Sequence, residues 1–440
     1  MWGDEALLFD FENSLATHDE LLDRYGPVCR IKGALGEDRL WIADPRAMND
    51  IILKGFDYFH EPEGFVAWIK LAFGPNIITT HGHKHKIQRK YSLVPICVDT
   101  PVFHAITRYL EDAVASNVRA NRCNTGIVDI HTWMSNVALE MIGQAGVGYS
   151  FGVMEGKEPE YLDASRQATE IYNQKKQALA NGTLESEIAA GNDIISMLLK
   201  QNEIVSPEEQ MTEQEILSQV NGALARTLHL LAQYPNVQDR LRAEVREAHG
   251  LYGKDLEYDQ LNSLIYLDAV CRESLRLWSP AQLIERVAMK DWVLPLQYPI
   301  KSKDGKKTIT NLHVPKGAHM YLSVGSVNRD KQTWGEDAEQ FNPDRWLQPL
   351  PSSVAESRIP GVYSNLMTFS GGPRSCIGFK FSQLEMKVVL SALIASFKFE
   401  LGPEEHLWSA AGIVKPYVRH KDGTIDPAPS LRMKVTLVDE

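Results

Sequence analysis

Over most of the chain, apolar residues recur at three- and four-residue spacing with polar residues between them, which predicts amphipathic helices. The predicted helices cover residues 83–93, 103–120, 131–146, 161–182, 211–232, 236–249 and 261–278, with a long helix from just after Cys376 to about Ser396. Short apolar and β-branched runs between turn residues predict strands at 28–31, 40–42, 287–294, 308–314, 319–323 and 431–438. The expected fold class is therefore mainly α with a small segregated β part. Since no convincing linker interrupts it, we expect one domain over residues 1–440.

Composition narrows the class of protein. The 440 residues are 44% hydrophobic, which is ample for a large core, and the net charge of -11 argues against a nucleic-acid partner. Five cysteines lie far apart along the chain, at positions 29, 97, 123, 271 and 376. Sparse, unpaired cysteines indicate reduced thiols in a protein that faces the cytosol. The sequence contains no apolar run near 20 residues, so we expect no membrane-spanning helix in it.

One cysteine lies in a glycine-rich loop directly before a predicted helix, in the segment FSGGPRSCIG from Phe369 to Gly378. Glycines such as Gly372 and Gly378 allow the backbone to approach a flat macrocycle. The amide groups of a helix N-terminus stabilise the Cys376 sulfur as an anion, and Arg374 can reach a carboxylate of such a ligand. These are the requirements of an axial thiolate to a haem iron. The alternative is a buried structural cysteine at a helix start.

The complete pattern Phe-x-x-Gly-x-Arg-x-Cys-x-Gly resembles the haem-binding loop of the cytochrome P450 family, in its eukaryotic, fungal microsomal type. The resemblance implies the cytochrome P450 fold and a haem b whose iron takes Cys376 as its axial metal ligand, with Phe369, Gly372, Arg374 and Gly378 in the cofactor site. It also implies a monooxygenase that inserts one oxygen atom from O2 into a lipophilic small molecule, in secondary metabolism. The electrons would come from NADPH through an NADPH-cytochrome reductase, and the thiolate would favour cleavage of the O–O bond.

A second motif places Glu273 and Arg276 on one face of the predicted helix 261–278. Taken alone, this spacing indicates a surface ion pair that contributes little to stability. In the resembled family, Glu-x-x-Arg pairs with the arginine of a Pro-x-Arg segment, which here is Pro343 to Arg345. The resemblance therefore implies that Glu273, Arg276 and Arg345 form a buried structural triad beneath the haem.

Three further side chains correspond to positions that bind haem propionates in the resembled family. Arg286 follows the Glu-x-x-Arg helix, and His85 and Arg89 share one helix face. The alternatives are an exposed strand arginine for Arg286 and a solvated basic face for the other two, while a metal site at the histidines is poorly supported. Arg374, Lys380 and Lys387 near the cysteine loop would form part of a basic docking face for the reductase, although a solvated surface explains them equally well.

The far side of the haem is where the sequence departs from the family. The family delivers protons there through an acid and an alcohol in a long central helix. Here Asn221 runs directly into Gly222, so the centre of that helix is missing by about a dozen residues, or about three turns. Thr227 has no acid before it at the required spacing, and no distal catalytic residue is identified. The pocket roof after Phe151 and the segment 95–101 are also shorter than the family pattern.

The family-like cysteine loop and the shortened distal side together leave three candidate functions. The first is the monooxygenase described above. The second is a haem-thiolate isomerase or dehydratase that needs no proton relay, and the third is a non-catalytic haem-binding relic. The resemblance further implies a monomer at the cytosolic face of the endoplasmic reticulum, although the chain as written has no N-terminal membrane anchor.

Overall fold

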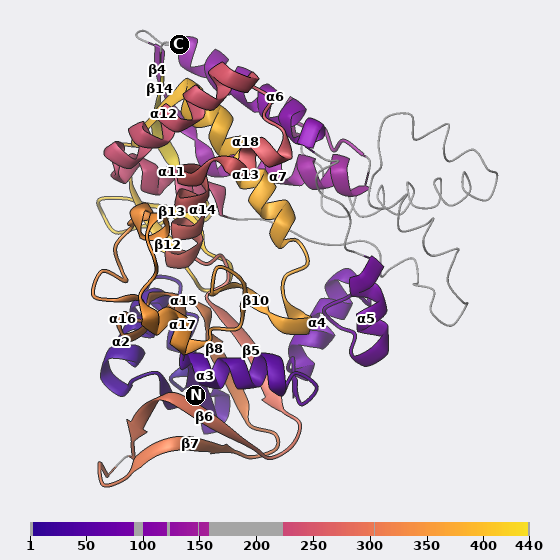
Figure 1. The fold of residues 1–440 in the computed structure, drawn as a ribbon, viewed down its shortest axis with the longest axis vertical. Helices are drawn as coiled ribbons and strands as arrows, with labels where there is room; N and C mark the ends of the chain where they lie inside the picture. Colours follow the sequence, from indigo (N-terminus) through magenta and orange to yellow (C-terminus); the bar gives the residue numbers. More distant parts are fainter. Residues whose placement is uncertain are drawn as a thin grey trace, which may run out of the picture.

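The structure is a computed structural model that describes residues 3–91, 100–120, 124–147, 149–157, 223–302 and 304–438. Helices gather at one end of the molecule and the β-sheets that contain β5, β6, β7 and β8 at the other (Figure 1). The long helix α18 (Phe379–Ser396) runs between the two parts. The expected fold class, mainly α with a small segregated β part, is confirmed.

The helical part consists of α6 (Thr100–Arg119), α7 (Ile130–Met141), α11 (Leu224–Gln233), α12 (Pro235–Tyr252), α13 (Tyr258–Ser263), α14 (Ile265–Leu277) and α18. Shorter helices accompany the sheets: α1 (Glu5–Leu8), α2 (Ser14–Tyr25), α3 (Pro45–Asn49), α4 (Glu63–Phe73), α5 (Gly82–Tyr91), α15 (Val324–Arg329), α16 (Lys331–Trp334) and α17 (Ser352–Ser357). A π-helical turn, η2 (Asp50–Lys54), continues α3, and another, η5 (Ile142–Val147), continues α7.

The largest sheet has the strand order β1-β2-β8-β5-β3. Its strands are β1 (Val28–Lys32), β2 (Asp38–Ile42), β8 (His319–Ser323), β5 (Leu283–Ala288) and β3 (Phe59–His60). Only β2 and β8 pair in parallel in this sheet. The short pairing of β3 with β5, His60 opposite Val287, brings the chain just after His60 beside Arg286.

A second sheet, β11-β14-β4, joins distant parts of the chain. It consists of β11 (Phe397–Leu401), β14 (Arg432–Leu437) and β4 (Thr125–Asp129), with β14 in the centre. Asp129 ends β4 and caps α7, because its carboxylate accepts the backbone N–H of His131 at 3.1 Å. The same carboxylate accepts the N–H of Leu431 at 2.9 Å, so β4, α7 and the segment before β14 are fastened at one point. The remaining strands form pairs: β6 (Trp292–Lys301) with β7 (Thr308–Val314), β9 (Gly361–Tyr363) with β10 (Leu366–Gly371), and β12 (Glu405–Ser409) with β13 (Lys415–Arg419).

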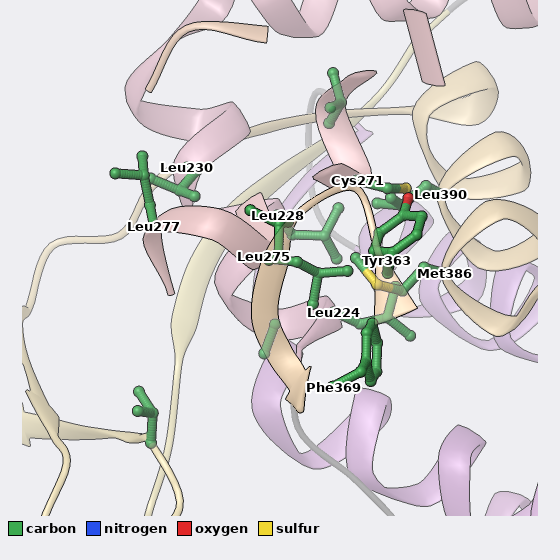
Figure 2. Close-up of a cluster of buried hydrophobic side chains, with 14 of the residues drawn as sticks. Leu224, Leu228, Leu230, Cys271, Leu275, Leu277, Tyr363, Phe369, Met386 and Leu390 are labelled. Atoms are coloured by element: carbon green, nitrogen blue, oxygen red, sulfur yellow. The ribbon is translucent and has the colours of Figure 1, made fainter. Parts of the chain in front are cut away.

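The core forms where α18 packs against α6, α12 and α14. Helix α18 is buried on nearly all sides, as its apolar residues at successive positions require. Figure 2 shows Met386 and Leu390 of α18 facing Leu275 of α14, with Tyr363 and Phe369 of the β9–β10 pair against them. The cysteine loop that follows β10 is therefore attached to the most deeply buried part of the protein.

Most predicted elements are confirmed within one to three residues, and two predicted boundaries are wrong. The predicted helix 261–278 is two helices, because the chain leaves helical geometry at Leu264, whose ψ is 98°. The predicted strand 287–294 combines the end of β5 with the start of β6, since a turn at 289–291 separates them. The predicted helix 161–182, the part of 211–232 before residue 223, and the shortened segments lie largely outside the described residues. Among the helices of the described ranges, none has the length and apolar character needed to cross a membrane.

Candidate functional site

The cysteine loop connects β10 to α18. After β10 the chain makes a 3-10 turn, η9 (Gly372–Arg374), and α18 begins at Phe379 with Gly378 in the capping position. The backbone N–H of Cys376 donates to the carbonyl of Phe369 at 2.8 Å, which closes the loop. Cys376 therefore lies directly before a helix N-terminus, as the sequence predicts.

The two glycines predicted for this loop have different structural reasons. Gly372 has φ of +60°, and a Cβ there would lie 2.7 Å from Leu53 Cδ2 and 3.0 Å from the Ile52 carbonyl oxygen. Both strain and contact with η2 thus exclude a larger residue, a reason that the sequence did not indicate. Gly378 has an ordinary φ of -87°, but its Cβ would lie 4.0 Å from Cys376 Sγ. A methyl group at Gly378 would therefore be in ordinary van der Waals contact with the sulfur, and no atom would have to move to admit it.

The electrostatics of the Cys376 thiol are balanced between burial and nearby donors. Burial raises the pKa of Cys376 above its ordinary value, whereas the Gly378 N–H and the Arg89 charge lower it. Burial is the larger effect, so the Gly378 N–H and Arg89 offset only part of the cost of an isolated thiolate. Coordination to a metal cation would supply the missing stabilisation, because a metal-bound thiol is deprotonated.

Two arginines brace the loop. Arg89 of α5 donates from Nη1 to the Ser375 carbonyl at 2.6 Å and from Nη2 to Ser375 Oγ at 3.0 Å. Arg374 donates to the carbonyls of Ile77 at 3.2 Å and Thr80 at 2.6 Å. Arg374 thus binds the segment before α5. Most of its terminal N–H groups are occupied by these hydrogen bonds, but its positive charge still acts on the cluster.

A carboxylate that the sequence analysis missed lies among these cations. Glu61 Oε1 is 3.5 Å from Arg286 Nη2, and Glu61 Oε2 is 3.8 Å from Arg374 Nη2. Burial alone would raise the pKa of Glu61, but Arg286 and Arg374 outweigh it and hold the pKa below its ordinary value. The pairing of β3 with β5 creates this contact. The local sequence around Pro62 contains no pattern that indicates it.

Two histidines complete the cluster in their neutral form. Burial, aided by the charges of Arg374 and Arg89, lowers the pKa of His85 to about 4. His81 Nδ1 accepts from Arg374 Nη2 at 2.5 Å, and burial followed by the Arg374 charge lowers the pKa of His81 too. The predicted residues His85, Arg89, Arg286 and Arg374 are therefore brought together, and His85 contributes no positive charge at neutral pH.

The charges of this cluster define the ligand that fits it. Arg89, Arg286 and Arg374 are half-buried to fully buried guanidinium groups, and Glu61 is the carboxylate in contact with two of them. Three cations against one anion leave an excess of two positive charges in a partly desolvated place, which is costly without counter-ions. A ligand with two carboxylates and a metal that accepts the Cys376 sulfur matches this excess.

The predicted triad joins α14 to the segment 342–346. Arg276 donates from Nε and Nη2 to Glu273 at 2.8 Å each, and Arg345 Nε lies 3.4 Å from Glu273 Oε1. The side chains of Glu273 and Arg276 are 0% exposed, so the surface-pair alternative is excluded by their burial. Glu273 also accepts the Trp346 Nε1–H at 2.9 Å and the Asn342 N–H at 3.0 Å. One carboxylate thus fastens α14 to the segment 342–346.

Thr227 of α11 is hydrogen-bonded within the interface between two helices. Its hydroxyl lies 2.7 Å from Ser274 Oγ of α14 and donates to the Ala223 carbonyl at 3.1 Å. Thr227 is 0% exposed, and its hydroxyl lies between the two helices.

One residue of the expected docking face is placed elsewhere. Lys387 is buried in α18, with Nζ at 2.8 Å from Asp268 Oδ1 and from Asn262 Oδ1. It fastens α18 to α13 and α14 and offers no exposed charge. The expectation that Lys387 belongs to a docking surface is therefore wrong.

A mainly helical fold, a cysteine loop at the start of a buried helix and a cationic cluster beside it are the features that a protein needs to hold a dicarboxylate metal cofactor through a thiolate. Comparison with known families gives the same result. The family description "Cytochrome P450" matches residues 5–184 and 167–411. The chain therefore belongs to the cytochrome P450 family, whose cofactor is a thiolate-ligated haem and whose general redox partner is an NADPH-dependent reductase.

Three curated relatives are fungal. Cytochrome P450 monooxygenase 91 of Postia placenta is 37% identical over 467 aligned positions, which cover 90% of this chain and 85% of that protein. Ganoderic acid synthetase of Ganoderma lucidum is 36% identical, with coverage of 93% and 87%. Cytochrome P450 monooxygenase 212 of Postia placenta is 35% identical, with coverage of 95% and 89%. The predicted family, fungal type and monooxygenase class are confirmed.

Proposed function

We propose that this chain is a haem-thiolate monooxygenase that inserts one oxygen atom from O2 into a lipophilic small molecule, with electrons from an NADPH-cytochrome reductase. The observation that carries the proposal is the partly buried Cys376 at the start of α18, beside a cluster with two excess positive charges. Haem fits this site, because its two propionates would compensate those charges and its iron would take the sulfur. When bound, haem supplies the activation of oxygen.

Each residue of the chain has a definite part in this proposal. Cys376 would hold the haem iron through its sulfur, and the Gly378 N–H, which donates to that sulfur, would reduce the electron density available to the iron. Arg286 would offer a buried charge to one propionate, and neutral His85 would offer a ring nitrogen. Arg89 and Arg374 compensate charge while they brace the loop.

The triad is proposed to act on the loop indirectly. Glu273, Arg276 and Arg345 hold the segment 342–346 against α14 without contact to the cluster around Cys376. They are therefore positioning residues, which keep the proximal side of the fold in one arrangement.

The setting and the assembly state belong to the same proposal. One relative is named for the synthesis of ganoderic acid, which supports secondary metabolism as the setting and a lipophilic substrate class. We propose a single domain, active as a monomer at the cytosolic face of the endoplasmic reticulum, in line with the general arrangement of the family. The docking of the reductase would involve exposed cations near the cysteine loop, of which Lys380 remains a candidate.

A second candidate function is favoured by the position of Thr227. Because its hydroxyl is bound between α11 and α14, this residue cannot supply the distal alcohol of the family. The aligned length of 467 positions exceeds the 440 residues of the chain, so the relative has residues without a counterpart here. A haem-thiolate isomerase or dehydratase, or a haem-binding relic, would need no distal relay.

The first experiment tests the ligand. The chain expressed with haem and reduced under carbon monoxide is expected to show the strongly red-shifted Soret band of thiolate ligation. Cys376→Ala should abolish the shift, whereas Cys29→Ala, which removes a thiol of similar exposure in β1, should keep it. A Cys376→Ala protein that binds haem with the shifted band would overturn the assignment of the ligand.

The second experiment separates the candidate functions. A monooxygenase consumes NADPH in the presence of reductase, O2 and a lipophilic substrate, and it forms one oxygenated product per NADPH when coupling is complete. An isomerase or dehydratase converts an already oxidised lipid without NADPH. A shifted Soret band with neither activity would support the relic. Sequencing the native transcript across the positions near Cys97, Ala164 and Asn221 would show whether the central helix is present in the natural protein.

A further inference from the structure

Glu61 occupies an unusual position for an acid near a cofactor that carries two carboxylates. Its side chain is 9% exposed and lies between Arg286 and Arg374, which are 9% and 13% exposed. It reaches this place because β3 ends at His60, opposite Val287 of β5, so that residue 61 follows directly beside the strand that carries Arg286. The position is fixed by sheet pairing and not by a flexible loop.

The distances show that Glu61 holds the two arginines loosely. The ion pairs measure 3.5 Å to Arg286 and 3.8 Å to Arg374, longer than the 2.7–2.9 Å of a charge-assisted hydrogen bond. Arg286 uses Nη1 in a hydrogen bond to the Glu285 carbonyl at 2.7 Å, and its Nη2 points to Glu61. A second carboxylate could therefore approach the same nitrogen more closely than Glu61 does.

The third neighbour of Glu61 supports an ionised carboxylate at this place. Since His81 Nδ1 accepts from Arg374, its hydrogen is on Nε2, and Nε2 lies 3.8 Å from Glu61 Oε2. Glu61 is thus surrounded by donors and cations on three sides, and its negative charge is maintained when no other anion is present.

We propose that Glu61 is a built-in counter-ion that competes with the haem propionates for Arg286 and Arg374, and so sets how tightly this chain retains haem. In the haem-free chain Glu61 compensates part of the buried positive charge and keeps the arginines in place. When haem enters, the propionates meet a carboxylate of like charge at the same guanidinium groups. The cofactor is consequently held less tightly than the three arginines alone would allow. This inference rests on the proposed haem site.

Removal of the Glu61 charge is therefore expected to strengthen haem retention. A charge within about 4–6 Å of an ionised group typically changes the equilibrium constant for forming that ionised group about tenfold or more. We expect Glu61→Gln to lose haemin about tenfold more slowly than the wild type. Glu63→Gln, two residues away in the exposed first turn of α4, is the matched control and should leave the rate unchanged.

The measurement is the transfer of haemin from the full chain to excess apomyoglobin, followed in the Soret region, together with equilibrium titration of the haem-free chain by haemin. A second probe, haemin dimethyl ester, lacks both propionate charges. With the ester, Glu61→Gln and the wild type are expected to bind equally, because there is no like charge to remove. These readouts are independent of catalytic activity.

Each other outcome decides against the inference. Equal or faster loss of haemin from Glu61→Gln would mean that Glu61 only orients the arginines, and this would overturn the proposal while the haem site stands. An equal gain with the ester would show that the effect is not electrostatic and would also overturn it. If the wild type binds neither haemin nor its ester, the proposed haem site fails, and the inference fails with it.

Discussion

The triad offers a prediction whose size can be worked from the contacts of Glu273. This carboxylate accepts two hydrogen bonds from Arg276 at 2.8 Å, one from Trp346 at 2.9 Å and one from the Asn342 backbone at 3.0 Å, with Arg345 at 3.4 Å. Glu273→Gln removes the charge and turns an N–H2 group toward donors. Because Arg276 and Arg345 stay buried without their counter-ion, we expect a loss of about 3–5 kcal/mol in the free energy of unfolding.

The assay is urea unfolding followed by tryptophan fluorescence and by far-UV circular dichroism. With a slope of about 3 kcal/mol per molar urea, the midpoint should fall by about 1 M or more. The control is Glu20→Gln, which removes the carboxylate of the Arg24–Glu20 pair in α2, where both side chains are about two-thirds exposed. That surface pair should contribute less than about 1 kcal/mol.

Two results would refute this reasoning. If Glu273→Gln shifts the midpoint no more than Glu20→Gln, burial of the triad has no energetic weight. The double variant Glu273→Leu with Arg276→Met should cost less than the sum of the two single changes, because each single change leaves a buried partner uncompensated. Strict additivity would show that the two side chains act independently.

Three further predictions concern buried groups. Thr227→Val should cost about 1–2 kcal/mol in urea unfolding, since Ser274 Oγ loses its partner, and should leave the carbon monoxide difference spectrum unchanged; a lost Soret shift would contradict this. Burial, then the Arg329 charge, lowers the pKa of His18 to about 4. The unfolded chain therefore takes up this proton first, and stability falls as the pH decreases from about 6.5 to 4. His18→Gln, which keeps an acceptor near Trp41 Nε1, should show a smaller decrease in the urea midpoint over that range, and an unchanged slope would speak against it. Burial raises the pKa of Glu385 to about 8, so stability falls as the pH rises from about 4.5 toward 8. The gain of Glu385→Gln over the wild type should be larger at pH 8 than at pH 5, and a pH-independent difference would refute the burial argument.

The features that sequence reasoning predicted well are those encoded locally or by ordered motifs. The position of Cys376 before a helix follows from a glycine-rich loop joined to an apolar run, and α18 begins three residues later. The spacing of Glu273 and Arg276 places both on one helix face, and the Pro-x-Arg segment indicated their partner. The first inference needed only the local pattern, whereas the burial of the triad and its third member came from the resemblance to the family.

The features that it missed depend on pairing between distant segments. Glu61 meets Arg286 only because β3 pairs with β5, and β3 is two residues long with no alternation to indicate it. The break at Leu264 likewise lacks a Gly or Pro in the sequence, so the 3.6-residue pattern continued across it. The role of Gly372 against Ile52 and Leu53 of η2 required the tertiary contact to be seen.

The central position of β14 has a consequence for how the protein is made. Asp129 caps α7 and is fastened to Leu431, 302 positions later in the chain. At about 5–20 residues per second, a ribosome needs about 15–60 s to synthesise that interval. Until then the backbone N–H and C=O groups of β4 that β14 will pair with have no strand partner, and such unpaired strand edges promote aggregation. The nascent chain should therefore depend on chaperones during this interval. The synthesis of β14 then determines when α7 is fixed in its final position.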